Sequence, residues 1–470
     1  MKIAIVGGGI SGCAIYLALK KRLPQPPASM AEHEFVIFES YDTTRNLASQ
    51  HAPGDTHSAS LIVGGGIGLH PNGVRSLERL NEDLARDVKL AGHCFNVQKF
   101  MSSYGRELAR LPCSSEDTYS ISLSRHALWS CLRNYVPDDL IVTKRVTQVI
   151  ANSNGRSVIQ FADGSPDEEA DLVIGADGLK SPTRRALFPE AKEDPYPPEF
   201  AGLVGVGGVV QGEEFKSLVE PCTINFVFGR NGFFGYSFVQ SLTNPSEYIS
   251  STSQSKTTPS DTVMWWSTYE MESCPDPRAV DKEAILRDLQ NRLDTWKDPI
   301  IQKILGTVNI QTIFPVNTTP ELPTWTRDGV IVIGDAAHTL TPTSGQGTCQ
   351  ALEDVECFSM LLSHFLKKTY DSLSDPSTAA LARIERETIA QVMQKHMEIR
   401  KPRVHAIQEK GKQFDQKKKN LGRVAEFMMY FGLFIMGKLP MPSWMTGLWT
   451  YDIANEVNYE ISKMEAENHH

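Results

Sequence analysis

Apolar residues near the start of the chain follow two different periods. The continuous apolar run from Ile3 to Val6 is typical of a buried parallel strand, and the stretch from Ile10 to Lys21 then carries apolar residues at helical spacing. A second strand is expected over Glu34 to Phe38, after a proline-containing link. Strand, glycine turn, helix and strand make a βαβ unit, which predicts a parallel sheet with a right-handed crossover.

Two later apolar runs, Asp171 to Ile174 and Gly329 to Ile333, are also followed by glycine, as strands are that end at a cofactor-binding edge. Between them, residues 200–314 are rich in β-branched and aromatic residues with Gly and Asn turns, which favours an antiparallel sheet. The chain becomes helical and highly charged over residues 379–416, and strongly apolar from Phe427 to Met436.

These patterns predict an α/β fold with three parts. A discontinuous Rossmann-like nucleotide-binding domain is expected over residues 1–75, 105–195 and 325–365. An inserted antiparallel β-sheet domain for the substrate is expected over residues 76–104 and 196–324, and a C-terminal helical region over 366–470.

Composition narrows the classes of function. With 41% hydrophobic and 22% charged residues, the 470-residue chain can bury a large core, and its net charge of −9 argues against a nucleic-acid partner. Eight cysteines are scattered without a CxxC pair or a metal-like His/Cys cluster, so we expect reduced thiols and no metal. Because no secretory signal and no 18-residue apolar span is found, we expect an intracellular protein, cytoplasmic or peripheral to a membrane.

The first motif, Gly7-Gly8-Gly9-Ile10-Ser11-Gly12, matches G-x-G-x-x-G between the first strand and helix. Glycines at 7 and 9 let the backbone turn tightly and approach a pyrophosphate, and Gly12 lets the helix pack closely on the sheet. Glu39, at the end of the next strand, can accept hydrogen bonds from ribose hydroxyls and would repel a 2′-phosphate. This motif therefore indicates FAD or NAD, against the alternative of a glycine-rich loop that binds nothing.

The second motif, Gly334-Asp335-Ala336-Ala337-His338, continues through Pro342 to Gly345-Gln346-Gly347-Thr348 and opens a helix. Asp335 can bind ribityl or ribose hydroxyls, and a glycine-rich helix start directs N–H groups and a positive dipole end toward an electron-rich ring. Reduced flavin carries negative charge at such an edge, so the motif favours FAD over NAD. The alternative is an ordinary strand-to-helix turn.

A third motif, Gly175-Ala176-Asp177-Gly178, is followed by Ser181 and Arg184. Its small residues allow close backbone approach, and Arg184 is a candidate for contacting a phosphate or the catalytic pocket. A turn that carries a surface arginine explains the pattern equally well.

In this order the three motifs resemble the class A flavoprotein monooxygenases, which include para-hydroxybenzoate hydroxylase and salicylate hydroxylase, and within that class the fungal secondary-metabolite enzymes. The resemblance covers most of residues 1–360. It implies a glutathione-reductase-like FAD domain with NADPH or NADH as a transient reductant. It further implies that the ADP part of FAD is held by Gly7, Gly9, Ser11 and Gly12, the ribose by Glu39, the ribityl chain by Asp335, and the isoalloxazine by the loop from Pro342 through Gly345 and Gly347 to Thr348.

Three more residues follow from this resemblance. The stretch from Gly64 to Leu69 resembles the family's flavin-side strand, where Gly65 would let the backbone contact the cofactor. Arg125, in Ser124-Arg125-His126, matches an arginine that contacts the FAD pyrophosphate. Tyr236 stands where the family often has a substrate-side tyrosine, so Tyr236 and Arg184 are the candidate catalytic residues. A purely structural role is the alternative for each.

One departure from the family bears on the substrate. Many fungal members place an arginine in the first substrate-domain strand to polarise a phenolate, but this chain has Gly207 there. The departure weakens a simple phenol-hydroxylase reading and favours a bulky, apolar, electron-rich aromatic or alkene secondary metabolite, such as an indole alkaloid. The resemblance implies that reduced flavin and O2 form a C4a-hydroperoxide, which hydroxylates or epoxidises that substrate.

Three alternatives stay open. The chain could be a flavin oxidase or dehydrogenase without oxygen insertion, or a non-catalytic flavin-bound binding protein. The apolar tail over residues 427–449 could contact a membrane surface, or it could pack as a helix over the domain junction.

Overall fold

The computed structural model describes residues 1–27, 30–43, 65–113, 118–240, 260–274, 281–307, 312–373, 377–415, 421–441 and 443–467. One half of the molecule is built on a six-stranded sheet with the strand order β18-β19-β12-β1-β2-β8. Every pairing in this sheet is parallel except that of β18 with β19. The strands are β1 (Lys2–Val6), β2 (Glu34–Glu39), β8 (Ile141–Thr143), β12 (Leu172–Gly175), β18 (Thr326–Arg327) and β19 (Val330–Val332).

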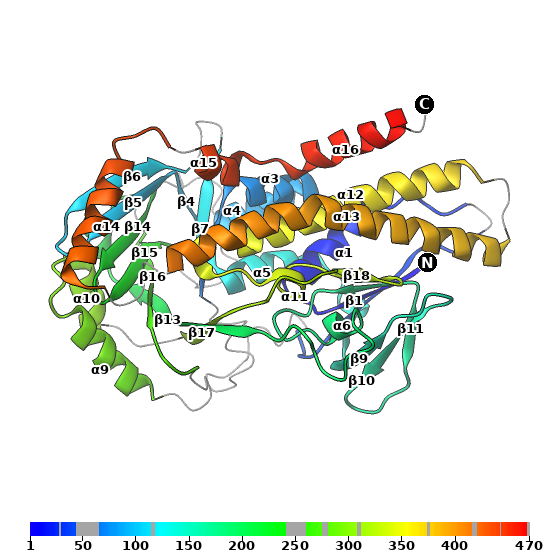
Figure 1. Ribbon diagram of the computed structural model, residues 1–470, viewed down its shortest axis with the longest axis horizontal. Helices are drawn as coiled ribbons and strands as arrows, with labels where there is room; N and C mark the ends of the chain where they lie inside the picture. The colour runs from blue at the N-terminus through cyan, green and yellow to red at the C-terminus, as the bar shows by residue number, and fades with distance from the viewer. Residues whose placement is uncertain are drawn as a thin grey trace.

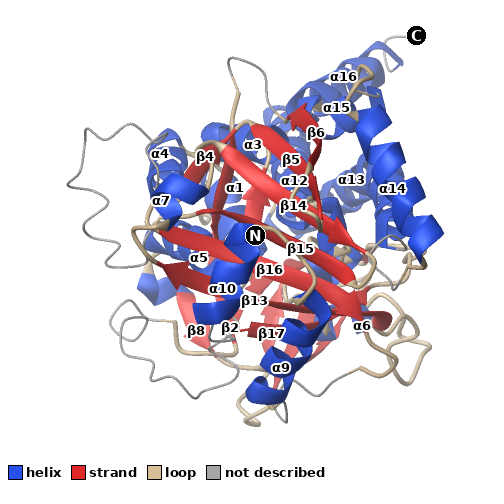
Figure 2. Ribbon diagram, turned by 90° about the vertical axis from the view of Figure 1, so that its left-hand side faces the viewer, coloured by secondary structure: helices blue, strands red, loops and turns tan. Residues whose placement is uncertain are grey.

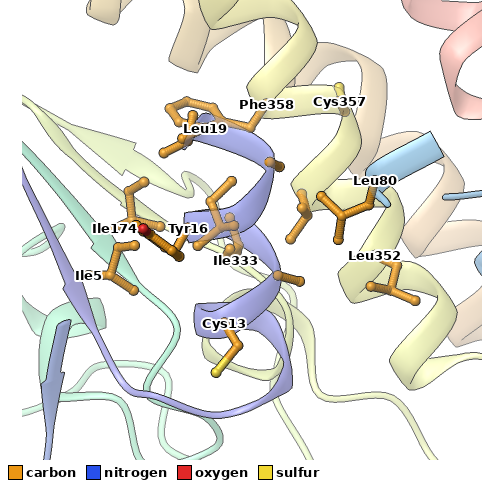
Figure 3. Close-up of a cluster of buried hydrophobic side chains, with 14 of the residues drawn as sticks. Ile5, Cys13, Tyr16, Leu19, Leu80, Ile174, Ile333, Leu352, Cys357 and Phe358 are labelled. Carbon is orange, nitrogen blue, oxygen red and sulfur yellow. The ribbon is translucent and has the colours of Figure 1, made fainter. Parts of the chain in front are cut away.

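The central strands of this sheet are apolar throughout because both faces are covered. On one face, Ile5, Ile174 and Ile333 meet α1 (Ile10–Arg22), and α1 in turn packs against α12 (Gly347–Asp371), as Figure 3 shows. The other face is covered by a three-stranded antiparallel sheet of β9 (Val146–Ile150), β10 (Ser157–Phe161) and β11 (Glu168–Ala170). The parallel sheet and βαβ unit expected from the sequence are thus confirmed.

A seven-stranded sheet forms the other half of the molecule, with the strand order β17-β13-β16-β15-β14-β5-β6. All its pairings are antiparallel except β14 with β5. Figure 2 views the molecule from the side on which this sheet lies. Its strands are β5 (Val97–Ser102), β6 (Glu107–Pro112), β13 (Glu199–Gln211), β14 (Thr223–Gly229), β15 (Gly232–Phe238), β16 (Thr262–Glu270) and β17 (Thr312–Thr318).

The two faces of the seven-stranded sheet have different neighbours. One face packs against α9 (Lys282–Leu293) and α10 (Pro299–Thr307) around Phe234, Trp265 and Ile301. The other face carries Phe226 and Trp266 and packs against α15 (Ser443–Thr450) through Met445 and Trp449. Because side chains alternate along a strand, each residue of this sheet belongs to one of two chemically separate surfaces.

Shorter elements join the two halves. A small antiparallel sheet orders as β3-β7-β4, and short helical segments lie between the strands. These elements are β3 (Gly66–Leu69), β4 (His93–Phe95), β7 (Ser120–Ser124), α3 (Pro71–Leu80), α4 (Glu82–Ala91), α5 (Arg125–Asn134), η1 (Asp138–Leu140), α6 (Pro182–Arg185), α7 (Phe215–Leu218), α11 (Asp335–His338) and η2 (Pro342–Ser344).

The C-terminal region is helical, as expected. The long helix α13 (Thr378–Asp415) runs beside α12, and α14 (Arg423–Met436), α15 and α16 (Ile453–Glu467) follow (Figure 1). Among the described residues, no helix combines the length and apolar character needed to cross a bilayer.

Element membership differs from the sequence expectation at three places. β6 was assigned to the nucleotide-binding part, but it pairs with β5 in the seven-stranded sheet. The second half of α3 (residues 76–80) and all of α4 were assigned to the substrate part, but Leu77, Leu80 and Leu84 are buried in the core that α1 and α12 share. Residues 282–307 form helices inside a region expected to be sheet. The first two differences depend on contacts between distant segments, which a local pattern does not reveal. The third does not, because the Asp281 side chain caps α9 and is a local helix signal.

Candidate active site

The three glycine motifs meet at one edge of the six-stranded sheet. Val6 pairs with both Phe38 and Gly175, and Gly175 pairs with Val332, so β1, β2, β12 and β19 end side by side. Because parallel strands present their carboxyl ends at the same edge, the loops that follow them are brought together there. Such an edge is where open α/β sheets bind ligands.

Two of these loop contacts leave no room for a side chain. Gly7 has φ +101°, and a β-carbon there would lie 2.5 Å from the carbonyl oxygen of Ala176 in the third motif. Gly334 has φ +57°, and its β-carbon would lie 2.6 Å from Oγ of Ser11 in the first motif. The three motifs therefore interlock through glycine backbone.

Gly9 and Gly12 play different parts in the first loop. A β-carbon on Gly12 would lie 1.8 Å from the carbonyl oxygen of Gly7, so this glycine closes the turn onto the helix. Around Gly9 no described atom lies within 4 Å of a β-carbon position. The loop is thus closely packed at Gly12 and open at Gly9. A loop that binds a pyrophosphate needs such an open position.

Glu39 fastens this loop from the neighbouring strand. Its Oε2 accepts a hydrogen bond from the backbone N–H of Gly8 at 2.7 Å, and its Oε1 accepts one from Tyr41 N–H at 3.1 Å. The ring N–H of Trp129 donates to the carbonyl oxygen of Gly8 at 2.9 Å. Because a carboxylate has about four acceptor positions, Glu39 keeps capacity for a hydroxyl of a ligand.

The second motif presents an unpaired carboxylate. Asp335 is half-buried at the start of α11, and no hydrogen bond joins its carboxylate to any described residue. The loop then passes Pro342 and Gly345, where φ is +60°, and reaches α12 at Gly347 and Thr348.

The first turn of α12 is free to bind an electron-rich group. It has no side-chain cap and no acidic residue, and a β-carbon on Gly347 would meet no described atom within 4 Å. Unpaired N–H groups and the positive end of the helix dipole are therefore available beside Thr348.

Arg125 and Gly65 complete the edge. Arg125 is exposed at the first position of α5, its backbone N–H donates to the carbonyl oxygen of Gly65 at 3.2 Å, and no ion pair to a described residue engages its guanidinium. Gly64, from the same matched stretch, lies outside the described residues. These groups fit FAD. Its phosphates need the open cradle at Gly9 and the free guanidinium, its ribityl hydroxyls need the free carboxylate oxygens of Asp335, and its ring edge needs the uncapped helix start.

A buried ionic network supports the helix start from behind, and the sequence did not predict it. Arg400 of α13 donates to Glu353 at 2.6 Å and to Asp354 at 2.8 Å, and all three side chains are fully buried. Asp354 also accepts from the backbone N–H of Gly334 at 2.9 Å and pairs with Nε2 of His338 at 2.6 Å. Burial alone would raise the pKa of Asp354, but His338 and Arg400 hold it below its ordinary value.

The network fixes the position of the Gly334 loop relative to α12 and α13. In the sequence, the only signal of this network was that Glu353 and Asp354 interrupt an apolar helix pattern. Their partner, Arg400, lies on another helix. A buried carboxylate needs a paired cation, so such a pattern could have prompted a search for one.

The contacts of Arg184 favour the structural alternative, and its catalytic role stays a prediction. Its side chain is 1% exposed, and its guanidinium donates to Asp194 at 2.6 Å and to the carbonyl oxygens of Leu179 and Ala336. With its donors held by the protein, Arg184 braces the third motif against the second.

The catalytic role of Tyr236 likewise stays a prediction, and its contacts favour a structural role. It lies on the face of β15 that packs against α9 and α10, its side chain is buried, and its hydroxyl donates to Asp298 at 3.2 Å. Strand alternation therefore directs Tyr236 away from β3, while Gly235 and Ser237 lie on the opposite face.

That opposite face carries large apolar side chains and approaches β3. A β-carbon on Gly66 of β3 would lie 1.6 Å from Sδ of Met264, and one on Gly65 would lie 3.8 Å from the ring of Phe314. Glycines on the same face make room for these rings, because a β-carbon on Gly205 would lie 2.2 Å from Phe314. The surface beside β3 is thus apolar and aromatic.

His70 joins this apolar face to the second motif, and the sequence did not single it out. Its Nδ1 lies 3.3 Å from Oγ of Ser120, its ring lies 5.7 Å from that of Trp449, and a β-carbon on Gly345 would lie 3.2 Å from its Nε2. Complete burial lowers the pKa of His70 to about 4, so the imidazole is neutral at pH 7. A histidine directly after the flavin-side strand was the available signal.

Comparisons with known proteins agree with this geometry. The family model described as an FAD binding domain matches residues 140–392. The aurachin C monooxygenase/isomerase of Stigmatella aurantiaca is 27% identical, with 77% of this chain and 81% of that protein covered. A salicylate hydroxylase of Pseudomonas putida is 24% identical (83% and 84%), and an FAD-dependent monooxygenase of Penicillium janthinellum is 25% identical (86% and 75%).

Solved structures share the fold over nearly the whole chain. A substrate complex of salicylate hydroxylase superposes with a TM-score of 0.70 at 19% identity and covers 97% of each chain. CtdE in complex with FAD and a substrate superposes with a TM-score of 0.69 at 17% identity and covers 100% of each chain. With the three motifs at one sheet edge and a family model that spans more than half its length, the chain belongs to the FAD-binding-domain family and is a class A FAD-dependent flavoprotein monooxygenase.

Proposed function

We propose that this protein hydroxylates or epoxidises a neutral, bulky, electron-rich aromatic or alkene substrate, with an indole alkaloid as the favoured class. The substrate would lie between FAD and the seven-stranded sheet. The observation that carries the proposal is the chemistry of the sheet face beside β3, where Phe226, Trp266 and Phe314 lie among glycines and no charged side chain occupies the central positions of the described strands.

The space at Gly207 explains why this face lacks a cation. A β-carbon on Gly207 would lie 2.8 Å from the carbonyl oxygen of Trp265 and 3.5 Å from Cβ of Trp266. An arginine at this position would have to displace the neighbouring strand or its tryptophan. A substrate with a phenolate or carboxylate would therefore be buried on this face without a partner, which is unfavourable.

The proposed residue roles follow from the contacts. When FAD is bound and reduced by NADPH or NADH, it supplies the activation of O2. Gly9 and Arg125 would hold its phosphates, Glu39 and Asp335 its hydroxyls, and the first turn of α12 its electron-rich ring edge. His70 would donate or accept one hydrogen bond as a neutral imidazole, and the apolar face would exclude water.

The relatives support both reactions. One relative is named a salicylate hydroxylase, and another, 23% identical over 79% of this chain and half of its own length, is a chloroplastic zeaxanthin epoxidase of Nicotiana plumbaginifolia. We propose that the six-stranded sheet with its helices forms the FAD domain and the seven-stranded sheet the substrate domain. We also propose that the segment 427–449 brings the protein to a membrane surface through its first part, which lies in α14, because apolar substrates concentrate there.

Matched pairs of small probes test the substrate class. We expect 3-methylindole to perturb the visible spectrum of bound FAD and to increase NADPH oxidation with formation of an oxygenated product. Indole-3-acetate should bind about 100-fold more weakly, because its carboxylate would have no cation on the sheet face. Equal or tighter binding of indole-3-acetate, or of salicylate, would overturn the proposal of a neutral substrate.

A further inference from the structure

Helix α14 presents its apolar side chains to solvent. Val424, Phe427, Met428, Phe431, Phe434 and Ile435 recur at spacings of three and four residues and are between 39% and 78% exposed. Most of the large exposed apolar residues in the described part of the chain lie between residues 424 and 439. Spacing of this kind places them along one side of the helix.

The inward side of α14 carries polar groups beside the buried Leu433, so the helix has apolar residues on both sides. The hydroxyl of Tyr430 donates to the carbonyl oxygen of Phe228 at 2.8 Å, and Glu426, which is 6% exposed, accepts from the backbone N–H of Arg230 at 3.2 Å. Hydrogen bonds therefore fasten α14 to the protein while its apolar side stays available for another partner.

Positive charge flanks the exposed side. Arg423 and Lys438 are exposed at the two ends of the helix, and the ammonium of Lys438 lies 5.5 Å from the centre of the Phe434 ring. In the sequence, residues 410–438 hold seven Lys or Arg and two Asp or Glu, within a chain whose net charge is −9. This stretch is thus basic in an acidic protein, and its charge is complementary to anionic headgroups.

We propose that α14 binds the surface of an anionic lipid bilayer, lying in the interface with Phe427, Met428 and Phe431 in the acyl region and Arg423 and Lys438 at the headgroups. A helix of this kind lies on a membrane and does not cross it, in keeping with its length of 14 residues. The structure assigns this role to α14 and not to α15, whose Met445 and Trp449 are buried against the sheet.

This docking would serve the proposed function, on which the inference about substrate uptake rests. A β-carbon on Gly437, just past α14, would lie 2.8 Å from Cβ of Ala109 in β6, and Met436 packs in the cluster that contains Phe226 and Trp266. Figure 1 shows α14 along the outer edge of the sheet beside β6. A bilayer bound there would lie next to the apolar face and could supply it with a lipid-soluble substrate.

Vesicle flotation of the FAD-loaded protein tests the docking without any turnover. We expect the protein to float with phosphatidylcholine vesicles that contain phosphatidylserine, and to float less with phosphatidylcholine alone. The double variant Phe427→Glu/Phe431→Glu should lower the bound fraction at least about tenfold, because two buried aromatic groups become charged. The matched control Tyr459→Glu changes a residue of α16 that is 64% exposed and should leave binding unchanged.

Three results would overturn the inference. The first is wild-type protein that floats with neither vesicle type, and the second is a double variant that binds as well as wild type. The third is light scattering that shows a wild-type dimer which the double variant abolishes, since α14 would then bind a second copy of the chain. FAD content and oxidation of 3-methylindole in the same preparations report the proposed function separately, so the two can fail independently.

Discussion

Gly9 and Gly12 belong to one loop, yet their surroundings differ in kind. We expect Gly12→Ala to prevent stable folding or to lower the melting temperature, because its β-carbon would overlap the carbonyl oxygen of Gly7. We expect Gly9→Ala to leave the melting temperature of FAD-free protein unchanged and to weaken FAD binding, because its β-carbon would fill open space in the cradle. Thermal melts and FAD titration separate these effects, and weakened folding with normal FAD affinity in Gly9→Ala would contradict the cradle.

Asp335 offers a second test at the scale of one residue. Its carboxylate has no hydrogen-bond partner among the described residues, so Asp335→Ala should fold normally. We expect FAD affinity to fall about 10- to 100-fold, the loss typical for a hydrogen bond between a charged group and a ligand hydroxyl. Gel filtration followed by the flavin absorbance measures the loss. Asp371→Ala, which changes an exposed carboxylate at the end of α12, is the control, and a fully yellow Asp335→Ala protein would refute the assignment.

From the sequence, we could predict which residues lie at the site better than we could predict which way their side chains face. The glycines and Asp335 were found because their spacing relative to a strand end is itself the signal, and the structure brings them to one edge. Arg184 and Tyr236 could not be judged in the same way. Whether an arginine faces a ligand or an internal aspartate, and which face of a sheet a tyrosine occupies, depends on partners that are distant in the sequence.

At the scale of elements, α13 holds a histidine that makes stability depend on pH. His396 is fully buried between the rings of Trp325 and Phe358, and neither ring nitrogen has a partner among the described residues. Burial lowers the pKa of His396 to about 4, despite the opposing effect of Asp354. The unfolded chain therefore binds a proton below its ordinary pKa of 6.5 while the folded chain does not, so stability falls as pH drops from 6.5 toward 4.

Substitution of His396 should flatten this dependence. Between pH 7.5 and pH 5 we expect His396→Leu to lose about 2 kcal/mol less stability than wild type, the difference that 1.5 pKa units represent. Urea unfolding at both pH values measures the loss. His405→Leu is the control, because His405 is half-exposed and pairs with Glu321. An identical loss in wild type and His396→Leu would show that His396 is protonated in the folded protein.

The elements themselves could be predicted where their signal is local. Apolar runs predicted β1, β12 and β19, and helical spacing predicted α1, because burial on both faces or on one stripe leaves its period in the sequence. The assignment of β6, of the second half of α3 and of α4 to the correct half could not be made. Their partners, β5 and α12, are set by long-range packing, and so is the ion pair of Arg400 with Glu353.

Across the whole molecule, three surfaces with different chemistry lie next to one another. The six-stranded sheet presents the residues that fit FAD, the seven-stranded sheet presents an apolar face beside β3, and α14 presents an apolar side at the outer edge of that sheet. Helices α12 and α13 and their buried ions fix the first of these surfaces. The arrangement suits a protein that collects an apolar molecule, shields it from water and oxidises it at a flavin.

Oxygen-isotope labelling shows directly whether the protein inserts oxygen into a neutral substrate. Wild-type protein loaded with FAD is supplied with NADPH, 3-methylindole and oxygen enriched in oxygen-18, and the product is analysed by mass spectrometry. We expect each product molecule to gain a single labelled oxygen atom and NADPH to be consumed in equal amount. Product oxygen derived from water, or labelled hydrogen peroxide formed with the indole unchanged, would contradict this expectation and identify a flavin oxidase.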